Sequence, residues 1–518
     1  NFFFSKEEIQ NNLSEICILG FCLILPASQI INFFFPLNNI FFYTSYLFSI
    51  FFIYLNRNNL ATLNRWILKI LFIFILFLPF KYVLKGNEDL FYHLPKVEFL
   101  NEFKIIFGIA HINSSLSFTN GWAHISSVFN FFNGSEKNLY IVSYVFYILV
   151  ILTLYDYLKS SNINNLKIFF VIIISFLIIK FNRLQEFGND YQSMLLMLLS
   201  LSLFLNYFFG SGNDKKILFN KIIFYSFFAF MLRIYALFLI PMFLIFFFKK
   251  INIFKTLNKK LLSIIIITLA STSITSFVNS GCFFMPIEKT CIDKKQVLWS
   301  YSEKVENLNV HLRAFNTSYF QYNQNNEKKI SRENWIKNFN WFFYHIKSER
   351  FLLPLAKIII IIFSIFLILA IKFKIKFKKI SSKELLFLSL SFLSLLLWLT
   401  FTPIIRAGGF IYLSFFLICF LIFNNKFQKL IEIKHIKYLF LVFSIILIIL
   451  NLNRINKEYK KYNTMNPFFF TYWYTLNSHY HDQYTKLKNH LLSKELENNL
   501  GDLKIIKKNN YWFIIPNN

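Results

Sequence analysis

Residues 261–279 read LLSIIIITLASTSITSFVN, a stretch without a charged residue that follows directly on Lys259 and Lys260. A helix that crosses the hydrocarbon core of a bilayer needs about 20 mainly apolar residues. The stretch has this length and composition, so it predicts a membrane-spanning helix. Similar stretches, separated by polar breaks, predict spans at residues 16–36, 39–55, 66–84, 138–157, 166–182, 191–209, 217–248, 261–279, 351–371, 384–403, 408–423 and 438–452.

The composition excludes a water-soluble globular protein. Of the 518 residues, 56% are hydrophobic, 21% are aromatic and only 16% are charged, which leaves too few polar side chains to cover a soluble surface. The formal net charge is +29, but the lysines and arginines are scattered between apolar segments. A nucleic-acid-binding protein would gather them on one solvated domain, so we expect no nucleic-acid partner.

The lysines between the spans predict how the chain is oriented, because loops rich in Lys and Arg stay on the cytoplasmic side. Three clusters stand out: Lys215, Lys216 and Lys221, then Lys249, Lys250, Lys255, Lys259 and Lys260, and then Lys372, Lys374, Lys376, Lys378, Lys379 and Lys383. With the first two clusters on one side, residues 217–248 must leave and return on that side, yet they are too few for two full spans. We therefore expect an interrupted or re-entrant hairpin near Arg233.

These observations predict an all-α polytopic membrane protein with about 11 to 13 transmembrane helices. Residues 1–452 form the membrane domain, with a cytoplasmic N-terminus and two large outer-face loops at 85–137 and 280–350 that carry interfacial helices. Residues 453–518 form a small C-terminal appendage on the outer face. We expect the bacterial inner (plasma) membrane as the location.

Two further features concern the outer face. Cys282 and Cys291 lie close together in the second loop, and we favour a disulfide, which an exported loop permits, over two separate thiols. In the tail, the runs LKII from Leu503 and YWFII from Tyr511 could pair as two short strands. One feature opposes the orientation, because the tail just after the last predicted span carries Arg454, Lys457, Lys460 and Lys461.

Residues 85–95, KGNEDLFYHLP, form the most informative polar stretch. The adjacent carboxylates Glu88 and Asp89 fall at the water–lipid boundary. In a helix that starts here, Asp89 and His93 lie one turn apart on one face, with Tyr92 beside them. The apolar residues recur at helical spacing and predict an interfacial helix over 90–107; they are Leu90, Leu94, Val97, Leu100, Phe103 and Phe107.

The two carboxylates have a simpler alternative role, because acids in the first turn of a helix are stabilised by its dipole. The density of polar and aromatic side chains in the same loop favours a site instead. These side chains are Lys96, Glu98, Asn101, His111, Asn113, Asn120, Trp122 and His124.

At these residues the chain resembles the GT-C glycosyltransferases, in particular the branch similar to dolichyl-phosphate-mannose protein mannosyltransferases and bacterial lipid-linked aminoarabinose transferases. The resemblance in motif covers residues 86–124, with weaker support from FMLRIYA at 230–236 and TPIIR at 402–406. One departure is that two additional spans, 16–36 and 39–55, precede the span that leads into the acidic loop.

The resemblance implies a transfer of sugar from a polyprenyl-phosphate donor to an acceptor hydroxyl on the outer face. It implies that an acid of the first outer loop is the general base, so Asp89 is the first choice and Glu88 the second. The substrate-binding candidates are Tyr92, His93, His111, His124, Arg233 and Arg406. For the two arginines, which could meet the lipid phosphate, the alternatives are a structural ion pair or a cytoplasmic turn at Arg233 and lipid-headgroup contact at Arg406.

The partners implied are a polyprenyl-phosphate-linked sugar, membrane lipids, and a glycan, lipid or protein acceptor. The sequence contains no metal-ligand cluster and no nucleotide-binding fingerprint, so we name no metal site and no certain cofactor, and we leave the participation of a divalent cation open. Two other functions stay in view: an enzyme similar to O-antigen polymerases or ligases, and a non-enzymatic lipid or glycan transporter, which should carry its polar residues near the bilayer midplane.

Overall fold

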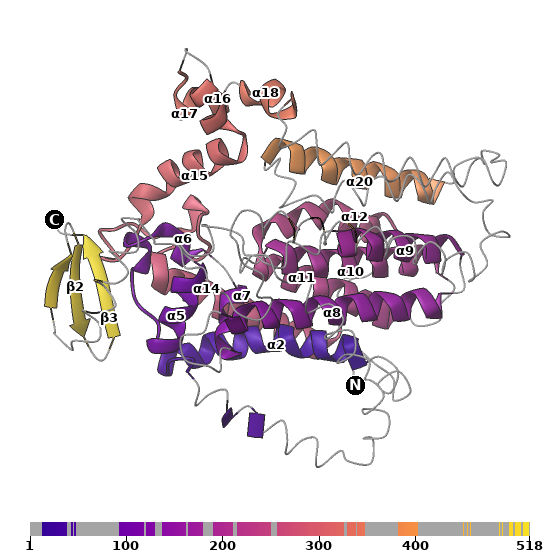
Figure 1. Ribbon diagram of the computed structural model, residues 1–518, viewed down its shortest axis with the longest axis horizontal. Helices are drawn as coiled ribbons and strands as arrows, with labels where there is room; N and C mark the ends of the chain where they lie inside the picture. Colours follow the sequence, from indigo (N-terminus) through magenta and orange to yellow (C-terminus); the bar gives the residue numbers. More distant parts are fainter. Residues whose placement is uncertain are drawn as a thin grey trace.

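The computed structural model in Figure 1 describes most of the central part of the chain. The described residues are 13–38, 43–44, 46–47, 93–118, 121–129, 137–161, 164–179, 190–210, 215–249, 256–325, 329–337, 339–347, 382–401, 497–500, 503–508 and 511–516, with 449, 453, 456, 486 and 489 as single positions. The predicted spans 66–84, 351–371 and 408–423 lie outside these residues, as do most of 39–55 and all of 438–452 except residue 449. Glu88, Asp89, Tyr92 and Arg406 also lie outside them.

The described chain is mostly helical, as an α-helical membrane protein requires. By length and composition, 5 of its helices could cross a membrane: Leu13–Phe34, Val142–Ser160, Asp190–Phe209, Lys259–Ser280 and Glu384–Phe401. The long helices are α2 (Leu13–Phe34), α8 (Lys137–Ser160), α9 (Asn164–Ile179), α10 (Asp190–Phe209), α11 (Lys215–Leu232), α14 (Lys259–Ser280) and α20 (Ser382–Phe401). They agree closely with the spans that the sequence predicts in the described regions.

The interruption expected near Arg233 is present. Helix α11 ends at Leu232, Arg233 is extended (φ −154°, ψ 129°), and the chain continues as a 3₁₀ segment, η6 (Ile234–Leu239), and a short helix, α12 (Ile240–Phe248), with a proline in its first turn. The rings of Phe219 and Phe246 lie 4.9 Å apart. The start of α11 and the end of α12 are therefore neighbours, and the segment is a hairpin that returns to the side from which it left.

The helix bundle has two chemically different ends. At one end α2 and α11 begin and α8 and α12 finish; we call it the basic end, because it carries Lys159, Lys215, Lys216, Lys249, Lys259 and Lys260. Helix α20 also begins there, since the ring of Phe387 packs against Phe208 and Phe209. The opposite end, which we call the loop end, carries the two long loops and the C-terminal sheet at the left of Figure 1.

A buried ion pair joins three helices near the basic end. Lys221 of α11 donates to Glu15 of α2 at 2.9 Å, and both side chains are buried. The other oxygen of Glu15 accepts hydrogen bonds from the hydroxyls of Tyr157 at 2.6 Å and Tyr225 at 3.1 Å. Because both charges are paired and hydrogen-bonded, the cluster can hold α2, α8 and α11 in one register.

We expect Glu15→Ala to destabilise the protein by about 3–5 kcal/mol, because it leaves the Lys221 ammonium buried without its carboxylate. Thermal unfolding of the purified protein in lipid nanodiscs measures the loss, and a Glu15→Leu, Lys221→Met double variant should recover most of it. Lys216→Met, which removes an exposed charge on the same helix, is the matched control and should change little. Equal effects of Glu15→Ala and Lys216→Met would contradict the role of the pair.

The first loop contains four short elements: α5 (Leu94–Glu102), η4 (Ile109–His111), α6 (Ser114–Ser117) and α7 (Gly121–Val128). The predicted helix over 90–107 is wrong beyond Glu102, because the backbone there forms hydrogen bonds outside its own segment. The Ile105 N–H donates to Asn32 O at 3.0 Å and the Phe107 N–H donates to Trp512 O at 2.9 Å. Pairing with distant chain thus overrides the local apolar stripe.

The second loop begins with the predicted disulfide between Cys282 and Cys291, which is confirmed. Its elements are η7 (Glu288–Thr290), α15 (Ser302–Asn316), α16 (Tyr319–Asn325), α17 (Arg332–Lys337) and α18 (Trp341–Lys347). These last four helices share a small core around the buried Trp335 and Trp341. The second loop therefore carries helices, as the sequence predicts, and they pack on one another.

The C-terminal sheet has three antiparallel strands in the order β1 (Glu497–Leu500), β2 (Leu503–Lys508) and β3 (Tyr511–Pro516). The predicted pairing of the two apolar runs is confirmed, with Ile505 opposite Ile514. Strand β3 also exchanges backbone hydrogen bonds with Phe107, and the buried faces of Ile505, Trp512 and Ile514 pack on the first loop. The described part of the predicted C-terminal appendage therefore packs on the first loop.

Candidate functional site

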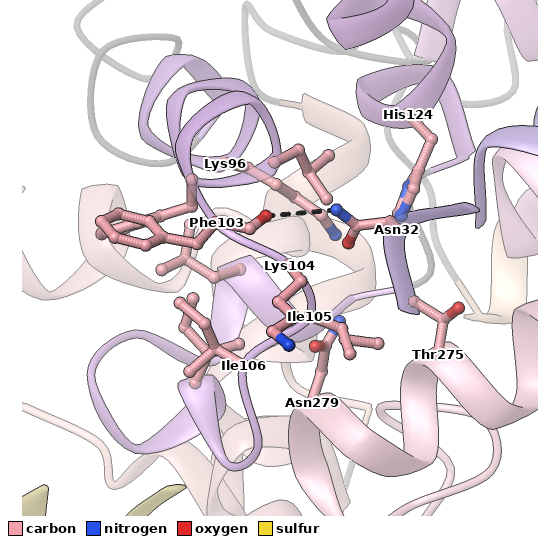
Figure 2. Close-up of a pocket in the computed structure, with 13 residues that line it drawn as sticks. Asn32, Lys96, Phe103, Lys104, Ile105, Ile106, His124, Thr275 and Asn279 are labelled. Carbon is pink, nitrogen blue, oxygen red and sulfur yellow. Dashed lines mark hydrogen bonds between the residues drawn. The ribbon is translucent and has the colours of Figure 1, made fainter. Parts of the chain in front are cut away.

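A small cavity of about 30 Å³, with apolar walls and a few polar groups, lies at the loop end between α2, α5, α7 and α14 (Figure 2). This volume has room for about one to three water molecules. The residues that line it are Asn32, Lys96, Phe99, Leu100, Phe103, Lys104, Ile105, Ile106, Ile109, Leu116, His124, Thr275 and Asn279. They include two lysines and no carboxylate, so the lining is positively charged, and its polar groups come from both loop and spans.

Asn32 enters the cavity from the last turns of α2 and is 1% exposed. Its amide nitrogen donates to Phe103 O at 3.2 Å, the contact drawn in Figure 2. The amide oxygen, Oδ1, is buried and has no hydrogen-bond partner among the residues that the structure describes. Buried acceptors are normally satisfied by protein or water, so this oxygen calls for a donor inside the cavity.

Thr275 presents a second unsatisfied oxygen from α14. Its side chain is 6% exposed, and within the described part of the chain its hydroxyl has no hydrogen-bond partner. Asn279 lies one helical turn further toward the loop end and also lines the cavity. In Figure 2 both side chains project from α14 toward Asn32.

Lys96 is the unusual residue of the site, because it is only 5% exposed. It lies in the first turn of α5, and its Nζ donates to Phe118 O at 2.8 Å. Burial, and then the positive charge of Arg233, lower the pKa of Lys96 to about 7. The amine is therefore partly neutral near physiological pH, and it can both donate and accept a hydrogen bond.

Arg233 lies at the break between α11 and η6, where its Nε forms an ion pair with Asp190 at the start of α10. Its guanidinium also lies 5.3 Å from the centre of the Tyr235 ring. Of the alternatives open for Arg233, the structure therefore shows an ion pair. Its charge still reaches Lys96, as the lowered pKa of that lysine indicates.

The histidines of the first loop separate into different environments. His124 lines the cavity, and His93 is buried at the start of α5. His111 does not line the cavity; its Nε2 lies 3.2 Å from Trp299 O and its ring packs edge-on against Tyr301. The structure thus brings His124 together with Lys96, and it places His111 against the second loop.

Sequence reasoning missed Asn32, Lys104, Thr275 and Asn279 as parts of the site. Three of them stand at the loop-end termini of two predicted spans, 16–36 and 261–279. Polar side chains within apolar spans are a usable signal, because they are costly there unless they meet a partner or a polar cavity.

His111 predicts an acid-sensitive contact between the two loops. Burial, and then the positive charge of Lys304, lower the pKa of His111 to about 4. As the pH falls through about 6.5, the unfolded chain binds a proton that the folded chain does not bind, so the folded state loses stability until the pH reaches about 4. We expect His111→Gln to weaken this loss, measured as the fall in Tm between neutral pH and pH of about 4.5. An unchanged fall would contradict the assignment.

Within the described residues, no group of three or more His, Cys, Asp or Glu side chains could hold a metal ion. A family model described as "Domain of unknown function (DUF8201)" matches residues 1–413. No curated protein and no solved structure matches the chain.

Proposed function

We propose that this chain, which belongs to the DUF8201 family, is a membrane glycosyltransferase that moves a sugar from a polyprenyl phosphate to an acceptor hydroxyl. One observation carries the proposal: a pocket that contains the unsatisfied oxygens of Asn32 and Thr275 lies against α5, and α5 begins a few residues after the carboxylates Glu88 and Asp89. Such a transfer needs a carboxylate that accepts a proton, a positively charged pocket for the leaving phosphate, and a position at the membrane boundary.

Two observations support the loop end as the outer face. The short connections at the basic end carry Lys159, Lys215, Lys216, Lys249, Lys259 and Lys260, in agreement with the positive-inside bias, which is counted over short loops beside the spans. The disulfide between Cys282 and Cys291 lies at the loop end, and disulfides persist in oxidising compartments. The N-terminus, from which α2 starts at the basic end, then lies in the cytoplasm.

The ends of the described helices agree with 11 full crossings besides the hairpin at 217–248. The end of α2 and helix α5 both lie at the loop end, so an even number of crossings must lie between them, and the predicted spans 39–55 and 66–84 would supply two. The predicted span 351–371 would take the chain from α18 to the start of α20, and the predicted spans 408–423 and 438–452 would return it to the loop end, where β3 pairs with Phe107.

In the proposed reaction Asp89, or Glu88 in its place, takes the proton of the acceptor hydroxyl. The acceptor oxygen forms a bond to the anomeric carbon, the bond from that carbon to the phosphate oxygen breaks, and the polyprenyl phosphate leaves as an anion. Lys104, and Lys96 when it is protonated, would favour that anion electrostatically. The acceptor is a glycan, a lipid or a protein.

The polar groups of the site favour this enzyme over a transporter. In the described spans the buried Glu15–Lys221 pair is fully partnered near the basic end, and the unsatisfied oxygens of Asn32 and Thr275 lie toward the loop end. A transporter should instead gather such groups near the midplane.

The direct test uses the purified full chain in nanodiscs with radiolabelled polyprenyl-phosphate sugars, one sugar at a time, and a membrane extract as the source of acceptor. We expect release of polyprenyl phosphate from at least one donor, together with labelled acceptor. Consumption of no donor, combined with movement of labelled lipid between leaflets of reconstituted vesicles, would contradict the enzyme and favour the transporter.

A further inference from the structure

The cavity contains both hydrogen-bond acceptors and hydrogen-bond donors that have unused capacity within the described chain. Asn32 Oδ1 can only accept a hydrogen bond, and the Thr275 hydroxyl can donate or accept. Lys96 uses one N–H on Phe118 O and has further hydrogen-bonding capacity at Nζ. A group that enters here must therefore donate to the asparagine and accept from the lysine or the threonine.

We propose that this cavity is a subsite for one hydroxyl or hydroxymethyl group of the substrate sugar, bound by Asn32, Lys96 and Thr275. The inference rests on the proposed function and deepens it, because it states which group of the substrate sugar binds in the cavity. A sugar hydroxyl both donates and accepts, so it satisfies these groups together, and water takes its place when no sugar is bound.

The hydrogen-bonding groups of the cavity argue for a hydroxyl over other groups. A fully ionised phosphate has acceptors only, which would face the acceptor oxygen of Asn32 and leave it unsatisfied. A metal ion finds no carboxylate among the lining residues.

The walls of the cavity match the rest of a sugar. Phe99, Phe103 and Ile106 supply apolar surface beside the polar groups, as carbon-bound hydrogens of a pyranose require. The Asn32 amide is fixed by its bond to Phe103 O, and Lys96 is fixed by its bond to Phe118 O. Both are held in place before a ligand arrives, which lowers the ordering cost of binding.

The test follows the reactivity of Lys96 with cyanate, which is small enough for the cavity and carbamylates neutral amines. The full chain in nanodiscs is treated near neutral pH, and peptide mass spectrometry compares Lys96 with the exposed Lys295. The added ligands are methyl glycosides of common hexoses, each paired with its own deoxy derivative. At about 100 mM, a glycoside of millimolar affinity should slow carbamylation of Lys96 about tenfold or more.

We expect at least one glycoside to protect Lys96 while its matched deoxy derivative does not, with Lys295 unaffected. Asn32→Leu and Thr275→Val should each remove the protection. Thr268→Val, the same substitution on α14 at a buried threonine that does not line the cavity, should retain it. Protection by no glycoside, equal protection by a deoxy derivative, or failure of Lys96 to react at all would each overturn the subsite.

The labelling assay does not depend on turnover, so it separates the two proposals when it is repeated on Asp89→Asn. Protection with unimpaired transfer in that variant would reject the catalytic base and keep the subsite. Loss of transfer without protection by any glycoside would keep the transferase and reject the subsite.

Discussion

The Asp89→Asn variant should transfer sugar about 10²–10⁴-fold more slowly than the unaltered protein, which is the usual contribution of a general base. The amide has nearly the shape of the carboxylate but cannot take the proton of the acceptor hydroxyl. Glu88→Gln should have a smaller effect if Asp89 is the base, and the double variant should have the largest. The rate of polyprenyl phosphate release in nanodiscs measures all three.

The matched control is Glu303→Gln, an exposed acid on α15 at the same end of the bundle. It should leave transfer unchanged, and all variants should insert and elute from size-exclusion chromatography as the unaltered protein does. Full activity of the Glu88→Gln, Asp89→Asn double variant would reject the general-base assignment, and with it the transferase in the form proposed.

The second large effect is expected from Gly108→Val, which should detach the C-terminal sheet from the first loop. Gly108 has φ +73°, and a Cβ there would collide with Ile514 O and lie 2.9 Å from the Cβ of Trp299. The left-handed backbone alone costs an L-residue about 1–2 kcal/mol, and the collision with a backbone oxygen of β3 is relieved only if the strand moves. The Phe107 hydrogen bonds to β3 would then be lost.

Limited trypsin digestion measures this detachment, because β2 carries Lys504, Lys507 and Lys508. We expect these sites to be cleaved at least about tenfold faster in Gly108→Val, since cleavage follows the population of the open form. Gly20→Ala in α2 is the matched control: nothing lies within 4 Å of the added Cβ, and alanine is the better helix former. Equal protection of both variants would show that the close approach at Gly108 does not hold the sheet.

Apolar periodicity and length predicted much of this fold. The stretch at 261–279 became α14, the hairpin turns at Arg233, and Ile505 faces Ile514 as two alternating strands require. In each case the signal is local, since the side chains that decide the structure are neighbours in sequence or face one another across a short turn.

The prediction failed where contacts with residues far away in the sequence determine the local structure. The stripe that ends at Phe103 and Phe107 has helical spacing, but the backbone at Phe107 pairs with Trp512 and Ile514, far along the sequence. The cavity could not be assembled from sequence for the same reason. Asn32 and Thr275 are single polar residues in separate spans, and no local pattern indicates that they line one cavity with Lys96.

The pairing of Phe107 with β3 also bears on how the protein is made. The first loop leaves the ribosome early, whereas its partner strand β3 lies far along the chain, at residues 511–516. Domains can fold as they are synthesised, but this loop cannot complete its backbone hydrogen bonds until β3 has been made. A product that stops before β3 would leave the Phe107 N–H and C=O without their partners on that strand.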